Sequence, residues 1–208
     1  GQTRTHAWGL TMLMNDEIDF YRERVNPDNA EQVWVAGEGW QDLTIHEEVI
    51  KIRGREDRLL RLRSSQHGPI INDPVPQVSE PPTDPSPPVS LFWTFLDPAN
   101  DSAKALYGLS RAQNMQEFEQ AASNHTSPGL NLIYADTQDN IAMWAIGLIK
   151  RWPRSNNGFS LLNGSIADDA FRGYQPFASN PRVINPAQGH IFSANNPYAE
   201  SNPRRRLP

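Results

Sequence analysis

The alternation of apolar and polar positions predicts short strands over the first third of the chain. Apolar residues dominate 7–14, and Ile18 and Phe20 then alternate with polar residues. A period of two is typical of strands with one buried face. The predicted elements are strands at 7–14 and 18–25 joined through 15–17, a hairpin at 31–43 turning at 37–39, and strands around 49–52 and 59–62 turning at 54–57.

A proline-rich stretch interrupts this pattern at residues 73–88, which read DPVPQVSEPPTDPSPP. So many prolines prevent ladder pairing, and too few apolar residues are present to form a core. A strand predicted at 89–97 follows immediately. We therefore interpret 73–88 as a surface insertion in a hairpin of one domain, rather than as a linker between two domains.

The second half of the chain changes period and predicts two helices. Asp101 or Ser102 is suited to cap a helix over 103–112, and Asn114 is suited to cap one over 115–123. Beyond the helices, the pattern predicts a hairpin over 130–147 turning at 137–140, mostly loop from 150 to 188, and a last strand at 190–194. The predicted class is therefore α+β.

Length and charge narrow the functional classes. A chain of 208 residues favours a single domain, and a net charge of −5 with one short basic run, Arg204–Arg206, argues against nucleic-acid binding. The absence of cysteine excludes disulfides and thiolate chemistry. No stretch reaches the 18 or so apolar residues of a membrane span or resembles a signal peptide, so neither membrane insertion nor a leader within residues 1–208 is expected.

General catalytic motifs are weak in this sequence. The five histidines show no metal-ligand spacing, no glycine-rich phosphate loop follows a strand, and no G-x-S-x-G motif occurs. No organic cofactor is therefore expected. On these features alone, an enzyme and a binding module remain equally plausible.

The order of the motifs distinguishes these classes. The chain resembles the middle of the β chain of the penicillin acylase (penicillin amidase) family over nearly its whole length. The motifs that carry this resemblance, in family order, are AWGLTMLMNDEIDFYRERVNPDN, EGWQDL, EEVIKIRGRED, HGPIIN, the helix pair, PGLNLIYADTQDNIAMWAIG and GYQPFASNPRVINPAQGHIFSANNP. The resemblance implies an N-terminal nucleophile hydrolase fold, an αββα sandwich of antiparallel sheets, of which residues 1–208 are an internal fragment.

The resemblance also implies a mechanism. In this family a precursor cleaves itself to expose an N-terminal serine, whose own α-amino group is the general base; an amine with a pKa near 8 suits that task. Gly1 resembles a position inside the family's β chain, so the nucleophile is expected outside residues 1–208. The expected partners are an N-acyl substrate and the remaining α-chain and β-chain segments of the same precursor, in the periplasm or outside the cell.

Two oxyanion-hole residues follow from the resemblance. The strand at 7–14 is similar to the family strand whose main-chain N–H contributes to the hole, which places that donor at Met12. Asn195 matches the family's oxyanion asparagine. By itself, Asn195-Asn196-Pro197 is typical of a turn. The resemblance implies that the Asn195 amide is catalytic and that Asn196 is structural, and it gives His67 only a structural role.

A calcium site is implied in the same way. The segment NDEID resembles the family's calcium loop, with carboxylates from Asp16 and Asp19 and the main-chain carbonyl of Ile18 as ligands. Such hard oxygen ligands suit calcium. The alternative interpretation is a polar turn with solvated acids. The function expected overall is amide hydrolysis by a penicillin acylase-like enzyme; the alternative is a non-catalytic, calcium-dependent β module that binds carbohydrate or peptide.

Overall fold

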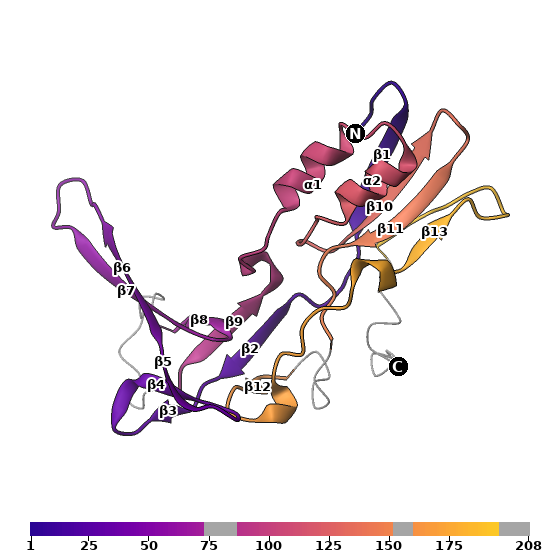
Figure 1. The fold of residues 1–208 in the computed structure, drawn as a ribbon. Coiled ribbons are helices and arrows are strands. Elements are labelled where there is room, and N and C mark those ends of the chain that lie inside the picture. The colour runs from indigo at the N-terminus through magenta and orange to yellow at the C-terminus, as the bar shows by residue number, and fades with distance from the viewer. Residues whose placement is uncertain (73–86, 152–159, 196–208) are drawn as a thin grey trace. The chain divides into compact units, whose positions relative to one another are not determined.

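The computed structural model describes residues 1–72, 87–151 and 160–195 (Figure 1). Mostly antiparallel strands and two α-helices confirm the α+β prediction. These residues form two compact units. Unit 1 comprises the described residues of Gly1–Glu17, Thr94–Arg151 and Arg172–Pro208, and unit 2 those of Ile18–Trp93 and Trp152–Phe171.

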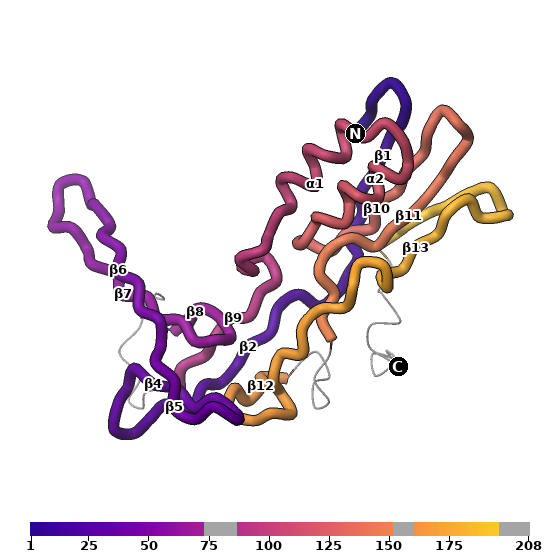
Figure 2. The backbone as a smooth tube through the Cα atoms, in the orientation of Figure 1, coloured from indigo at the N-terminus to yellow at the C-terminus, as the bar shows by residue number. Residues whose placement is uncertain are grey.

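The chain passes between the two units more than once (Figure 2). It leaves unit 1 after Glu17 and returns to it at Thr94, so the units are interleaved in sequence rather than arranged as successive domains. The single domain expected for residues 1–208 and the stacking of its sheets remain predictions. No helix in the described ranges combines the length and apolar character needed to cross a membrane.

Unit 1 is built on one four-stranded antiparallel sheet. Its strands, in spatial order, are β1 (His6–Met12), β10 (Leu130–Asp136), β11 (Ile141–Ile146) and β13 (Arg182–Ile184). Leu10, Leu132 and Trp144 lie opposite one another across three strands and therefore share a face. The buried core of this unit consists of Leu109, Ala112, Phe118, Ala121, Ala122, Leu132, Tyr134, Ala142, Trp144 and Ile146.

Two short helices supply the other side of this core. They are α1 (Ser102–Leu109) and α2 (Met115–Ala122). The Asn114 side chain accepts a hydrogen bond from the main-chain N–H of Glu117 at 2.9 Å, so the predicted cap is confirmed, whereas Asp101 makes no side-chain capping bond. Gly108 allows the helices to pack closely, because a Cβ there would lie 2.8 Å from that of Ala121.

Unit 2 contains three small sheets. These are β12 (Leu162–Asn163), β2 (Ile18–Arg22) and β9 (Val89–Trp93); β3 (Val25–Asn26), β4 (Asn29–Val35) and β5 (Gly39–Asp42); and β6 (Thr44–Ile50), β7 (Arg58–Ser65) and β8 (Gly68–Pro69). The chain also has 3-10 turns at Thr94–Leu96, Ala167–Asp169 and Phe177–Ser179.

The residues that flank the proline-rich stretch pair with each other. The Ile71 N–H donates to the Val89 carbonyl at 2.9 Å, and the Val89 N–H donates to Asn72 Oδ1 at 2.7 Å. The described residues on either side of the stretch, 71–72 and 89, therefore lie next to each other, and the surface insertion stays a prediction. Residues 73–86 themselves lie outside the described residues, and so do Asn196, Pro197 and Arg204–Arg206.

The last predicted strand is wrong. Residues 190–195 belong to no strand, because two apolar residues in an extended segment do not suffice without a partner that completes the ladder. Other boundaries also shift: β1 ends at Met12, β2 at Arg22 and β9 at Trp93. The short strands β12 and β13 fall in the segment predicted as loop.

Candidate functional site

The end of β1 presents a main-chain donor at the edge of the sheet. The Leu13 N–H donates to the Gly129 carbonyl at 3.1 Å, toward the neighbouring chain that leads into β10. Successive N–H groups of an extended chain point to opposite edges, so the Met12 N–H points away from β10. Its acceptor is Asn195 Oδ1, at 2.9 Å.

Asn195 reaches this edge from the far end of the described chain, 183 residues away in sequence. Its φ of 55° lies in the left-handed region, which asparagine tolerates better than most residues. The structure thus brings together the two residues that the sequence predicted as oxyanion donors. It also adds a detail that the sequence did not show: one of them donates to the other.

This hydrogen bond determines which end of the Asn195 side-chain amide can bind another group. Because Oδ1 accepts the Met12 N–H, the Nδ2 group of Asn195 is turned away from the strand. An amide NH₂ fixed in this way is a donor of the kind that stabilises a developing oxyanion. Both residues are exposed.

Three further polar residues surround this contact, and sequence reasoning missed all of them. Thr11 Oγ1 lies 2.5 Å from Ser193 Oγ. The buried Asn131 donates from Nδ2 to the Met12 carbonyl at 3.0 Å. A signal was available for Asn131, because it is the polar residue within the apolar stretch of the predicted strand 130–136.

The residues predicted to bind calcium fall in different units. In unit 1, Asp16 Oδ1 lies 3.9 Å from the Lys150 ammonium, and both side chains are nearly buried. In unit 2, Asp19 is a buried residue of β2, and Ile18 begins that strand. No group of three or more histidine, aspartate or glutamate side chains within 1–72, 87–151 and 160–195 is arranged to hold a metal. The predicted calcium ligands include only two such side chains, Asp16 and Asp19, together with the Ile18 carbonyl, so this finding does not test the prediction.

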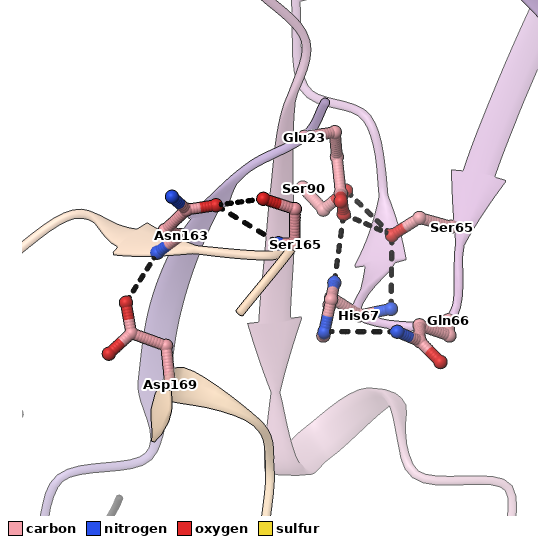
Figure 3. Close-up of polar contacts among 8 residues, drawn as sticks. All are labelled: Glu23, Ser65, Gln66, His67, Ser90, Asn163, Ser165 and Asp169. Atoms are coloured by element: carbon pink, nitrogen blue, oxygen red, sulfur yellow. Dashed lines mark hydrogen bonds and ion pairs between the residues drawn. The ribbon is translucent and has the colours of Figure 1, made fainter. Parts of the chain in front are cut away.

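A second polar cluster lies inside unit 2 around Glu23 (Figure 3). Glu23 Oε1 accepts hydrogen bonds from Ser65 Oγ at 2.5 Å, Ser90 Oγ at 2.6 Å and His67 Nδ1 at 2.9 Å. The side chains of Glu23 and His67 are only 1% and 6% exposed. His67 is therefore a buried partner of a carboxylate that joins residues from β7, β9 and the turn before β8.

The cluster keeps Glu23 ionised. Burial by itself would raise the pKa of this carboxyl, but hydrogen bonds from His67, Ser65 and Ser90 outweigh it and lower the pKa below its ordinary value. Tyr21 stacks on the His67 ring with centroids 4.0 Å apart, and burial raises the pKa of the Tyr21 hydroxyl. The cluster is thus a charged, hydrogen-bonded part of the interior of unit 2.

Comparison with known proteins decides the family. The model of the penicillin amidase family matches residues 1–207. The chain belongs to the penicillin amidase family. The relatives that the chain matches are named as acylases.

The names of the relatives refer to two kinds of substrate. The acyl-homoserine lactone acylase QuiP of Pseudomonas aeruginosa is 24% identical over 194 residues, and penicillin G acylase of Escherichia coli is 25% identical over 197 residues. These matches cover 91% and 94% of this chain and 22% of each relative. The chain therefore spans about a fifth of the length of these penicillin amidase family members.

A solved structure supports the same fold. Thermostable penicillin G acylase from Alcaligenes faecalis superposes with a TM-score of 0.76 and 26% identity, over 95% of this chain and 34% of that chain. The α+β architecture of residues 1–208 is thus that of a penicillin amidase family member.

Calcium binding stays a prediction for this member of the penicillin amidase family. Calcium takes six to eight oxygen ligands, so Asp16, Asp19 and the Ile18 carbonyl would need further ligands. We expect chelation to lower the melting temperature of the intact enzyme, since saturation at about 100 times Kd contributes about 2.7 kcal/mol. Asp19→Ala is expected to remove this sensitivity in differential scanning calorimetry. Equal melting temperatures with and without chelator would rule out the site.

Proposed function

We propose that residues 1–208 supply the oxyanion-stabilising part of an amidohydrolase that releases N-acyl groups from an amine. The observation that carries this proposal is the hydrogen bond between the Met12 N–H and the Asn195 amide, on the side of β1 that faces away from β10. It supports the oxyanion role that the family resemblance gave to Asn195. The single hydrogen of the Met12 N–H is bonded to Asn195 Oδ1, so Met12 orients the amide in this arrangement. The match to the penicillin amidase family favours this hydrolase over a carbohydrate- or peptide-binding module.

The reaction follows from charge development at the substrate carbonyl. When a serine hydroxyl attacks, the carbonyl oxygen gains negative charge, and the Asn195 Nδ2 group donates to it. A donor fixed beforehand stabilises that charge in the transition state more than it stabilises the bound substrate. The nucleophile and its α-amine base are contributed by a segment of the same precursor outside residues 1–208.

The substrate class is an amide that joins an acyl group to a small amine. The relatives are named for penicillin G and for acyl-homoserine lactones, which share this bond and differ in the amine. Export to the periplasm or beyond the cell belongs to the same proposal. It rests on the family resemblance.

The direct test is amine release from penicillin G and from a series of acyl-homoserine lactones. We expect the intact, processed enzyme to hydrolyse at least one of them, and the purified chain of residues 1–208 to hydrolyse none, because it has oxyanion donors without the nucleophile. Turnover by the 208-residue chain that co-purifies with it and disappears on substitution of one of its own serines would overturn the proposal.

A further inference from the structure

The segment that carries Asn195 is attached to unit 1 by side chains. Residues 191–195 join no strand ladder, yet they contact the last two residues of β1. Thr11 bonds Ser193 through their hydroxyl groups, and the Met12 N–H bonds the Asn195 amide. The two contacts involve adjacent residues of β1 and residues two positions apart in the 191–195 segment, so they hold the segment against β1 at two points.

Asn131 supports both attachment points from the neighbouring strand. It lies directly opposite Thr11 in the register of β1 and β10, and only 8% of it is exposed. Its Nδ2 group donates to Thr11 Oγ1 at 3.4 Å and to the Met12 carbonyl at 3.0 Å. A buried amide is costly unless it is hydrogen-bonded, and these bonds go to the two β1 residues that hold the 191–195 segment.

We propose that Thr11, Asn131 and Ser193 are positioning residues that fix the orientation of the Asn195 amide. The inference rests on the proposed function. Thr11 Oγ1 accepts from Asn131 and shares a second hydrogen bond with Ser193 Oγ, in which either hydroxyl can be the donor. Ser193 then fixes the backbone two residues before Asn195, while the Met12 N–H fixes Oδ1, and together they direct Nδ2.

Such positioning matters because oxyanion stabilisation depends on geometry. A misplacement of about 1 Å can cost up to about a hundredfold in rate. The 2.5 Å contact between Thr11 and Ser193 is the part of the network that can be removed without touching Asn195. Loss of this contact leaves the Asn195 amide present but fixes its orientation less firmly.

The test is a double-mutant cycle in the intact, processed enzyme. We expect Thr11→Val, which keeps the branched shape and removes the hydroxyl, to lower kcat by about tenfold with KM changed by less than about twofold. Thr11→Ser is expected to restore kcat. Ser193→Ala should match Thr11→Val, and it carries the test if the β1 variant does not fold, because residue 193 lies outside the sheet.

The decisive measurement is Thr11→Val or Ser193→Ala in an Asn195→Ala background. If the hydroxyl pair acts through Asn195, neither substitution lowers kcat further there. Equal losses with and without Asn195 would overturn the inference, as would an unchanged kcat in both single variants. If Asn195→Ala lowers kcat while both hydroxyl variants keep the wild-type kcat, only the positioning role is refuted. If Asn195→Ala itself keeps the wild-type kcat, the proposed function is refuted.

Discussion

Asn195→Ala in the intact, processed enzyme is expected to lower kcat by about 10²- to 10³-fold with little change in KM. The reason is that the lost donor acts on the oxyanion of the transition state and only weakly on the neutral carbonyl of the bound substrate. Steady-state kinetics on the best substrate of the proposed panel measures this. Processing of the precursor is checked by mass spectrometry, since an unprocessed variant would also lose activity.

Two further variants make this prediction specific. Asn195→Asp keeps an oxygen to accept the Met12 N–H, so the chain stays in place, but it puts a carboxylate where the donor was; its kcat is expected to fall at least as far. Asn185 is the matched control. Its φ is 44° and its Oδ1 accepts the Ile141 N–H at 2.9 Å, so it has the same local features as Asn195.

Asn185→Ala is therefore expected to have a similar structural cost and a near-normal kcat. If processed Asn195→Ala turns over like the wild type, or if Asn185→Ala loses as much, the amide at 195 only shapes a turn. The first interpretation of Asn195-Asn196-Pro197, as a turn without a catalytic role, would then be correct.

Glu23→Ala is expected to reduce the free energy of unfolding by about 3 to 5 kcal/mol. The substitution leaves three donors, on Ser65, His67 and Ser90, without their buried acceptor. Glu31→Ala is the control in the same unit, because the ion pair of Glu31 with Arg61 is roughly half exposed and is expected to contribute about 0 to 1 kcal/mol. Urea unfolding followed by tryptophan fluorescence compares the two variants, and equal losses would contradict the role of the cluster.

The same carboxylate predicts a pH dependence. The pKa of Glu23 is lower in the folded protein than its ordinary value of 4.5, so the folded state binds this proton less readily than the unfolded chain. Its stabilisation is present above that ordinary value and is lost as the pH falls through the folded pKa. Glu23→Gln, which cannot ionise, is expected to unfold with a flatter acid dependence than the wild type; an identical slope would exclude Glu23 as the source.

The sequence by itself predicted the elements whose defining hydrogen bonds join residues close together in the chain. Asn114 caps α2 because its side chain needs only the N–H three residues later. Asp139 takes a φ of 63° in the turn of the hairpin predicted over 130–147, as a residue that tolerates the left-handed region should. Such signals depend on a few neighbouring residues, so they can be recognised without knowledge of the fold.

Contacts between distant segments required the tertiary structure. The residues bonded to Glu23 are 42 to 67 positions away in sequence, and no spacing rule connects them. Residues 190–194 have the apolar character of a strand, but no ladder receives them, and side-chain bonds hold the chain instead. Met12 and Asn195 were predicted from a family resemblance. The hydrogen bond between them, across 183 residues of sequence, arises only because folding brings the 191–195 segment against the end of β1.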